Sequence, residues 1–215
     1  SDFGIGLAPD NPKSLSNLLI KKGYDIKFLE QLGLINLANN DYYDAFARRI
    51  TFPLHDIEGN VVGYSCRIYR NEDTAKYINT KETYLYVKGH NLFNYYRAKA
   101  PAKREKSLII VEGQMDAIRV YEAGIKNVVA LMGTALTKEQ IDLIKKLHAK
   151  VILCLDGDDA GKKATLINGE LLNNASVKVQ VIRLSDYKDP DEYIWHKGTA
   201  PFQSNVAKPI DFIDF

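Results

Sequence analysis

The residues of this chain best suited to chemistry are six acids that gather in three short segments of its second half. They are Glu112, Asp116, Asp156, Asp158, Asp189 and Asp191. Carboxylates packed this closely repel one another and raise one another's pKa values, and a divalent cation removes that conflict. Hard oxygen ligands suit Mg²⁺ or Mn²⁺, and such sites typically serve phosphate chemistry. The spacing therefore predicts a metal site that acts on phosphates.

The segments around these acids read as strands alternating with helices. Strands are expected at 108–111, 128–131, 151–155 and 178–183, and helices at 117–123, after Thr137 and at 160–172. Continuous apolar strands in this order favour a parallel sheet with helices on both faces, whose ligands lie beyond the carboxyl ends of the strands. The acids follow three of those ends, so we expect them to meet at one edge of the sheet.

A simpler interpretation is that each acid only caps a helix where a strand turns into it, which is common for Asp. For any single acid this interpretation is as good as a metal ligand. It does not explain why three strand ends should all carry paired acids.

The first half of the chain has a different pattern. Helices are expected at 12–22 and from the cap Asp25 to Gly33, followed by a hairpin of 49–54 and 61–69. This half is mixed α+β, and Lys99–Lys106, which contains Pro101, is the predicted linker to the α/β half. Residues 1–107 carry 16 Lys+Arg against 12 Asp+Glu, a balance of +4, and residues 108–215 carry 13 against 15, a balance of −2. The basic half could face a polyanion.

Several classes of protein are disfavoured by the sequence. No apolar run approaches the roughly 20 residues that span a bilayer. The two cysteines, Cys66 and Cys154, lack CxxC spacing, so no zinc site is expected, and both should be buried thiols. No phosphate-binding G-x-x-x-x-G-K-[ST] loop and no nucleophilic Ser/His/Asp set is present.

Two acidic motifs resemble a known family. Val111–Asp116 reads E-G-x-x-D after a strand, and Asp156–Gly161 reads D-x-D-x-A-G after a later one. Both are similar to the Toprim domain of DnaG-type primases, topoisomerases, OLD-type nucleases and RecR-type repair proteins. Six further segments resemble, in order, motifs of the bacterial primase polymerase region. They are residues 49–54, 63–67, 76–80, 88–89, 132–137 and 188–192. The resemblance covers nearly the whole chain, with Cys66 and Gln114 as departures.

The resemblance implies a fold and a set of roles. Residues 1–98 would be an α+β subdomain for template and nucleotide, 99–200 a Rossmann-like Toprim domain, and 201–215 the start of a helical subdomain. Glu112, Asp156 and Asp158 would be the catalytic metal ligands, supported by Asp116, Asp189 and Asp191. The residues implied to hold NTP phosphates or the template backbone are Arg67, Lys76, Asn79 and Lys88, with Arg48 and Arg49 as nearby template contacts. A solvated surface cation, or a turn-shaping Asn79, is the simpler alternative.

The implied activity is that of a primase, a DNA-directed RNA polymerase that makes short RNA primers on single-stranded DNA from NTPs. Two or more Mg²⁺ or Mn²⁺ ions would serve the phosphoryl transfer, with no zinc in this chain. Implied partners are the template, NTPs, an RNA/DNA heteroduplex, guanosine tetraphosphate, and a replicative helicase bound through a C-terminal domain outside this chain. The chain lacks an initiator Met, and we expect an excised, monomeric core from the bacterial cytoplasm, associated with the nucleoid and not with a membrane.

Two other functions fit the acidic motifs, and a third, ranked last, fits Asp156 alone. One is another Toprim enzyme, a nuclease or topoisomerase fragment, which would cut DNA instead of making RNA. The other is a nucleic-acid-binding Toprim module without catalysis, which would tolerate Asp156→Asn. A phosphoacceptor protein, in which Asp156 takes a phosphoryl group, would not need Glu112.

Overall fold

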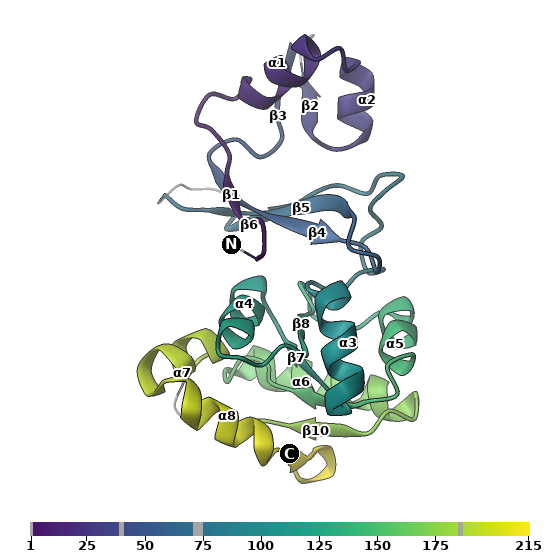
Figure 1. Ribbon diagram of the computed structural model, residues 1–215, viewed down its shortest axis with the longest axis vertical. Helices are drawn as coiled ribbons and strands as arrows, with labels where there is room; N and C mark the ends of the chain where they lie inside the picture. The colour runs from purple at the N-terminus through teal and green to yellow at the C-terminus, as the bar shows by residue number, and fades with distance from the viewer. Residues whose placement is uncertain (1, 39–40, 71–74, 185–186) are drawn as a thin grey trace. The chain divides into compact units, whose positions relative to one another are not determined.

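The computed structural model describes residues 2–38, 41–70, 75–184 and 187–215. The chain divides into two compact units: unit 1 comprises residues 1–56 and 60–88, and unit 2 comprises 57–59 and 89–215. Unit 1 is α+β with antiparallel strands, and unit 2 is α/β with a mainly parallel sheet (Figure 1). The predicted fold class is confirmed.

The main sheet of unit 1 has the strand order β1-β4-β5-β6 and is antiparallel throughout. The strands are β1 (Gly6–Leu7), β4 (Arg49–His55), β5 (Val61–Ile68) and β6 (Tyr77–Asn79). β4 and β5 form the predicted hairpin, in which Asp56 Oδ1 accepts a hydrogen bond of 2.9 Å from the backbone N–H of Asn60. Phe52 and Leu54 are buried along β4 and anchor the sheet in the core of this unit.

Two helices and a second hairpin complete unit 1: α1 (Ser14–Lys21), α2 (Ile26–Gln31), β2 (Ile35–Ala38) and β3 (Asp41–Asp44). Asp25 caps α2 as predicted, because its Oδ1 accepts from the N–H groups of Lys27 and Phe28. Asp44 is buried and accepts from the N–H groups of Leu15 and Ser16, at 2.7 and 2.8 Å. These bonds satisfy amide groups in the first turn of α1, which that helix itself cannot pair.

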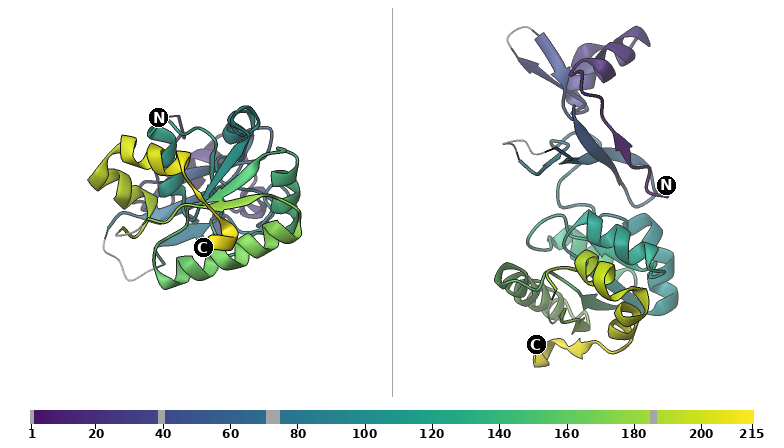
Figure 2. Two further views of the ribbon diagram at one scale, coloured as in Figure 1. Left: turned by 90° about the horizontal axis from the view of Figure 1, so that it is seen from below. Right: turned by 90° about the vertical axis from the view of Figure 1, so that its left-hand side faces the viewer.

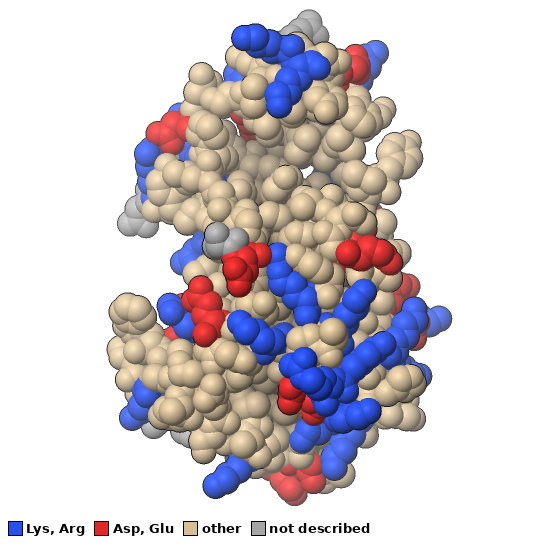
Figure 3. All heavy atoms as spheres, in the orientation of Figure 1, with Lys and Arg blue, Asp and Glu red and all other residues tan. Residues whose placement is uncertain are grey.

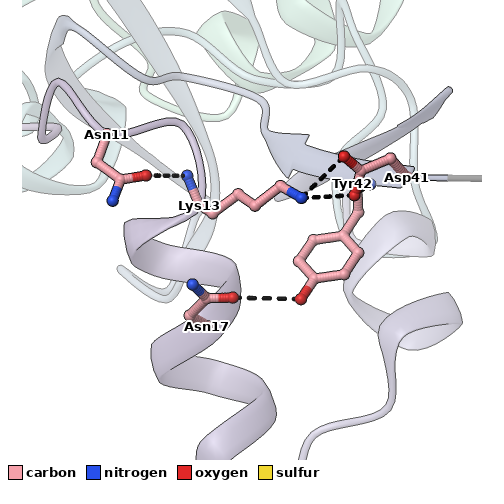
Figure 4. Close-up of polar contacts among 5 residues, drawn as sticks. All are labelled: Asn11, Lys13, Asn17, Asp41 and Tyr42. Carbon is pink, nitrogen blue, oxygen red and sulfur yellow. Dashed lines mark hydrogen bonds and ion pairs between the residues drawn. The ribbon is translucent and has the colours of Figure 1, made fainter.

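Side chains outside the core also join α1 to the second hairpin (Figure 4). The Lys13 ammonium lies 2.6 Å from Asp41 Oδ1, and the Tyr42 hydroxyl donates to Asn17 Oδ1 at 3.2 Å. The hydrogen bond from Lys13 lowers the pKa of the exposed Asp41 carboxyl. Exposed pairs of this kind contribute little to stability, so the buried Asp44 does more to position α1.

The sheet of unit 2 has the strand order β11-β10-β9-β7-β8. Its strands are β7 (Ser107–Val111), β8 (Val128–Ala130), β9 (Lys150–Leu153), β10 (Val179–Val181) and β11 (Ile210–Asp211). The first four are parallel, and β11 pairs antiparallel with β10. All five residues of β7 are buried, as expected for a central strand covered on both faces.

Helices cover both faces of this sheet (Figure 2). They are α3 (Tyr95–Glu105), α4 (Gln114–Glu122), α5 (Lys138–Lys145), α6 (Asp159–Asn174), α7 (Pro190–Lys197) and α8 (Thr199–Ala207), followed by the 3₁₀ turn η1 (Phe212–Asp214). The core on one face joins α3, α5 and α6 to Leu108 and Ile110 of β7. Successive strand residues point to opposite faces, so Ile109 and Val111 face the other side of the sheet.

The predicted linker at Lys99–Lys106 was wrong, because residues 99–105 belong to α3. Ala98 and Ala102 are fully buried against the sheet, and the Tyr95 hydroxyl donates to the carbonyl of Leu143 at 2.9 Å. This packing holds the segment helical although Pro101 lacks an amide proton. The charged residues that suggested a linker form the outer face of the helix.

Two smaller expectations concern the cysteines and membrane-spanning segments. Cys66 and Cys154 are both buried free thiols, as predicted. Burial raises the pKa of Cys66 to about 12, and it raises the pKa of Cys154 as well. Among the described residues, no helix is long and apolar enough to cross a membrane.

Candidate active site

The acids predicted from the sequence lie in unit 2, after the carboxyl ends of its strands. Glu112 directly follows β7 and Asp156 lies three residues beyond β9, and these two strands are neighbours in the sheet. Glu112 Oε1 accepts a hydrogen bond of 3.1 Å from the backbone N–H of Asp156. The first and second acidic segments therefore touch directly, across 44 residues of sequence.

Three of the acids also bond to the first turns of helices. Asp158 caps α6 by accepting from Gly161 N–H at 2.8 Å, and Asp189 caps α7 by accepting from Glu192 N–H at 2.8 Å. Asp116, in the first turn of α4, accepts from the N–H of Gly113 at 3.2 Å. The capping interpretation is thus correct for these residues. It does not exclude a metal, because a carboxylate has about four acceptor positions and a cap uses one.

Asp191 has a partner that the sequence did not reveal. Its Oδ1 lies 2.5 Å from Nε of Arg119 on α4, and its backbone N–H reaches Asp116 Oδ1 at 3.4 Å. The Arg119 guanidinium also lies 5.7 Å from the ring of Trp195, whose side chain is exposed. Arg119 stands three residues after Asp116, a helical spacing that places both on one side of α4. This spacing was the signal in the sequence that Arg119 lies near the acids. Asp191 is therefore charge-paired, unlike the acids nearest the sheet.

Burial and mutual repulsion raise the pKa values of the central carboxyls. Desolvation is the largest cause for both Asp116 and Asp156, followed by neighbouring carboxylates, and it brings each pKa to about 7. Desolvation also raises the pKa of Glu112, which the hydrogen bond from Asp156 partly offsets. Carboxyl groups whose pKa values are raised by burial and by neighbouring charges are typical of functional sites.

The donor set fits a divalent cation in its chemistry. Asp156 Oδ1 is buried and has no hydrogen-bond partner, so it is an acceptor that nothing in the described protein satisfies. Glu112, Asp156 and Asp158 would hold the ion, with Asp116 behind them. Within the described ranges, however, no three His, Cys, Asp or Glu side chains converge on one point that could hold a metal. Glu112 and Asp158 each accept one backbone amide in this structure, from Asp156 and from Gly161.

Gly161 allows α6 to start against Asp156. A Cβ atom on Gly161 would lie 2.1 Å from the carbonyl oxygen of Asp156, far inside contact distance. The glycine of the D-x-D-x-A-G motif is therefore needed for close packing, and Asp158 can cap α6 only because the helix approaches this far.

Substituting Gly161→Ala should push the first turn of α6 away from Asp156. We expect a loss of about 1–3 kcal/mol in the free energy of unfolding and a roughly 10–100-fold weaker affinity for Mn²⁺. Chemical denaturation and calorimetric Mn²⁺ titration would measure the two effects. Gly133→Ala is the matched control for stability, because a Cβ there meets nothing within 4 Å. Equal effects of the two substitutions would contradict this account.

Asn168 on α6 is a site residue that sequence reasoning missed. It is fully buried; its Oδ1 accepts from Leu136 N–H at 2.7 Å, and its Nδ2 donates to the carbonyls of Thr134 and Ala164. The bonds to Leu136 and Thr134 hold the loop that follows β8 beside the middle of α6. A lone Asn within a helix gives no sequence signal for such a role.

Replacing Asn168 by Ala should leave the buried N–H of Leu136 and the part-buried carbonyl of Thr134 without their present partner. The expected destabilisation is about 2–4 kcal/mol, because each unsatisfied group costs roughly 1–3 kcal/mol. Thermal and denaturant unfolding would measure it. Asn173→Ala, on the exposed side of the same helix, should change stability by less than about 0.5 kcal/mol, and a similarly small effect at Asn168 would refute the role.

A hollow of about 560 Å³ opens beside the acids, lined in part by Asp156, Lys162 and Arg183. Arg183 donates to the carbonyls of Asp214 and Phe215, at 3.2 and 2.6 Å. Lys188, from the segment before α7, is close enough to lower the pKa of Glu112. Positive side chains thus stand beside the carboxylates, as phosphate binding would require.

The basic residues predicted from the sequence all lie in unit 1. Register places Arg67 of β5 and Asn79 of β6 on one face of the sheet, because Arg67 pairs with Tyr77 and Ser65 with Asn79. Arg49 pairs with Ile68 and so lies on the opposite face. The sheet therefore separates two residues that the sequence had placed in one group.

The remaining basic candidates differ in how they are held. Arg48 donates to the carbonyl of Asp10 at 3.2 Å, and Arg49, which is buried, donates to the carbonyl of Ala75 at 2.9 Å. Lys76, Asn79 and Lys88 are exposed, and Arg67 is half-buried with its guanidinium 5.8 Å from the Tyr77 ring. Contacts of Arg48 and Arg49 within unit 1 shape this unit, and their template role stays a prediction.

Family models match both halves of the chain. A model described as DNA primase catalytic core, N-terminal domain, matches residues 1–99, and one described as Toprim-like matches residues 109–194. The DNA primase of Staphylococcus aureus is 42% identical over 205 residues, covering 94% of this chain and 34% of that protein. The DNA primase of Clostridium acetobutylicum is 38% identical over 213 residues, covering 99% and 35%. The chain spans about a third of the length of these curated relatives.

Solved structures agree with the family models. The RNA polymerase domain of Mycobacterium tuberculosis primase DnaG has a TM-score of 0.89 and 31% identity, covering 100% of this chain and 72% of that one. The zinc-binding and RNA polymerase domains of Aquifex aeolicus primase give a TM-score of 0.87 and 37% identity, covering 96% and 51%. With both halves matched and the acids at the strand ends of a Toprim-like sheet, the chain belongs to the family of DnaG-type DNA primase catalytic cores.

Proposed function

We propose that this chain is the catalytic core of a DNA primase, which joins NTPs into short RNA primers on a single-stranded DNA template. The observation that carries the proposal is the acidic edge of the unit 2 sheet, where a buried oxygen of Asp156, beside Glu112, has no hydrogen-bond partner among the described residues. Membership of the primase family supports the choice of reaction. DNA as the ligand is supported by relatives, because the M. tuberculosis domain was solved with a double-stranded DNA oligomer that has a 6-nucleotide overhang.

Each residue of the acidic edge has a task in such a reaction. Divalent ions, when bound, activate the attacking 3′-hydroxyl and neutralise the leaving pyrophosphate. Glu112, Asp156 and Asp158 supply the oxygen ligands, and Asp116 adds negative charge behind them. Arg119 fixes Asp191 and with it the start of α7. Lys162 and Lys188 place positive charge where phosphates would lie.

Further partners are proposed with the function. Arg67, Lys76, Asn79 and Lys88 would contact the NTP or the template, and an RNA/DNA heteroduplex would be the product. A monomer at the bacterial nucleoid, a response to guanosine tetraphosphate and a replicative helicase, contacted by other parts of a longer protein, belong to the same proposal.

The product of the reaction tests the proposed function. The chain should convert labelled NTPs into short oligomers on single-stranded DNA with Mn²⁺ or Mg²⁺, and the product should be sensitive to ribonuclease. Addition of EDTA should abolish synthesis. Shortened DNA without RNA would instead indicate a Toprim nuclease, and DNA binding without either product would indicate a non-catalytic module.

A further inference from the structure

The edge of the unit 2 sheet at which the parallel strands begin carries a row of lysines. Lys106 precedes β7, Lys150 begins β9, and Lys178 precedes β10. Lys150 N–H donates to the carbonyl of Lys106 at 3.1 Å, and Val151 N–H donates to the carbonyl of Lys178 at 2.8 Å. The three lysines therefore stand at the start of adjacent strands, which are spaced by about 4.8 Å.

More positive charge surrounds this row. We define the basic edge as Lys103, Arg104, Lys106, Lys145, Lys146, Lys150 and Lys178. Within 103–106, 145–150 and 176–178 there is one acid, Glu105, and it lies 3.1 Å from Nε of Arg104. Figure 3 shows Lys and Arg side chains gathered on the face over α3 and α5, with few acids among them. The local charge is thus far above the +2 of the whole chain.

The basic edge also contains a hollow. Its volume is about 540 Å³, and it lies between the ends of α5 and α6 and the starts of β9 and β10. The charged or titratable side chains that line it are Lys145, Lys146, His148, Lys150 and Lys178. No acidic residue is among the described residues of its lining. Such a concave surface concentrates positive potential on a bound anion.

Helix electrostatics explain only part of this arrangement. The helix macrodipole stabilises basic side chains in the last turn of a helix. This accounts for Lys103 and Arg104 at the end of α3 and for Lys145 at the end of α5. Lys150 and Lys178 stand at strand starts, where no dipole favours them. Lys106 adopts a φ of 52°, a conformation in which glycine is the usual residue after a helix. Helix dipoles therefore do not account for the row of three lysines.

We propose that the basic edge binds the phosphate backbone of nucleic acid, as a second contact surface apart from the acidic edge. Lys106 and Glu112 lie on either side of β7, so the two surfaces are about 20 Å apart at ~3.3 Å per residue. Protein partners favour aromatic and Arg anchors and interfaces poor in Lys. The described lining of the hollow has four lysines and no Phe, Tyr or Trp, which fits phosphates better than an acidic protein. The proposal rests on the proposed function only in the kind of ligand, and it needs no catalysis.

The salt dependence of DNA binding tests this proposal. A fluorescently labelled single-stranded 20-mer would be titrated with the 215-residue chain in EDTA, without NTPs, over a range of NaCl concentrations. The test variant is Lys106→Gln/Lys150→Gln/Lys178→Gln. The control is Lys138→Gln/Lys197→Gln/Lys208→Gln, three exposed lysines of unit 2 outside the basic edge, which changes the net charge equally.

We expect the slope of log K against log salt to fall by about 2 in the test variant, at ~0.7 for each lost phosphate contact. The control should keep the parent slope. Equal slopes for all three proteins would overturn the proposal, and so would an equal fall in both variants, because net charge alone would then suffice. Tighter binding of a glutamate homopeptide of the same charge than of the DNA would also overturn it, in favour of an acidic protein.

Two further variants separate folding and catalysis from binding. Lys150 donates to Gln180 at 2.8 Å, so the double variant Lys106→Gly/Lys178→Gln leaves that contact intact and should lower the slope by about 1.4. Asp156→Asn should keep the DNA affinity of the basic edge while losing primer synthesis. If the parent chain made no primer but the basic-edge variants still lowered the slope of log K against log salt, the proposed function would fail and the second binding surface would stand.

Discussion

Asp156→Asn is expected to reduce primer synthesis by at least about 100-fold, because the acidic edge loses a charged ligand at its centre. The same substitution should raise the thermal unfolding temperature of the metal-free protein. Desolvation of the half-buried Asp156, and after it repulsion from Glu112 and Asp116, raises its pKa to about 7. A neutral amide of the same shape removes that repulsion. Ribonuclease-sensitive product and calorimetric melting in EDTA would measure the two effects.

The control for this substitution lies in the same segment. Asp159 is fully exposed in the first turn of α6 and lies 3.4 Å from Lys162. Asp159→Asn should leave both synthesis and melting temperature near the parent values. Synthesis by Asp156→Asn at the parent rate, with the parent response to Mn²⁺, would eliminate the metal-ligand role. A loss of synthesis together with a lower melting temperature would point to misfolding instead.

In the metal-free protein, stability should fall as the pH rises from about 4 to about 7. Asp116 and Asp156 have pKa values of about 7 when folded, against an ordinary value of 3.8. Between these values the folded state holds protons that the unfolded state has released. The free energy of unfolding therefore decreases with pH in this window and levels off above it.

The size of this effect is a few kcal/mol for the pair. One unit of pKa shift corresponds to about 1.4 kcal/mol, and the two shifts share their causes, so they do not add in full. For a chain of this length that amounts to roughly 5–10 °C in melting temperature. Saturating Mn²⁺ should oppose the trend, because the ion binds the deprotonated carboxylates and stabilises more as the pH rises.

A comparison of the parent with Asp116→Asn isolates the contribution of Asp116 to the pH dependence of the melting temperature. Asp116→Asn removes one titrating group, so its melting temperature should depend less steeply on pH than that of the parent between pH 4 and 7. Melting curves in EDTA at half-unit steps would show this. A parent profile that rises across this window, or an Asp116→Asn profile of equal slope, would show that these carboxyls do not titrate as argued.

Much of unit 2 could be predicted because its signals are local. The apolar run at 108–111 was a strand, Thr137 and Gln140 formed the capping box at the start of α5, and Asp25 capped α2 in unit 1. Such signals act between residues a few positions apart. They also placed Glu112 and Asp156 just beyond the carboxyl ends of two strands, and the parallel sheet then brought them together.

Other features could not be read from the sequence. The segment 99–106 looked like a linker because Pro101 and its charges outweighed the helical spacing of Ala98 and Ala102, and only burial against the sheet decided the outcome. The two faces of the unit 1 sheet separate Arg67 from Arg49 through strand register, which no local pattern specifies.

The sequence by itself determined the family, the fold class and the acids at the strand ends, since short motifs and periodic burial carry that information. The tertiary structure alone decided which acids are paired and which are exposed to mutual repulsion. Arg119 meets Asp191 across 72 residues, whereas a buried oxygen of Asp156 has no partner in the part of the chain that the structure describes. The strand order of unit 2 likewise aligned Lys106, Lys150 and Lys178. Contacts between residues so far apart in sequence depend on the folded arrangement of whole elements, and no local pattern encodes them.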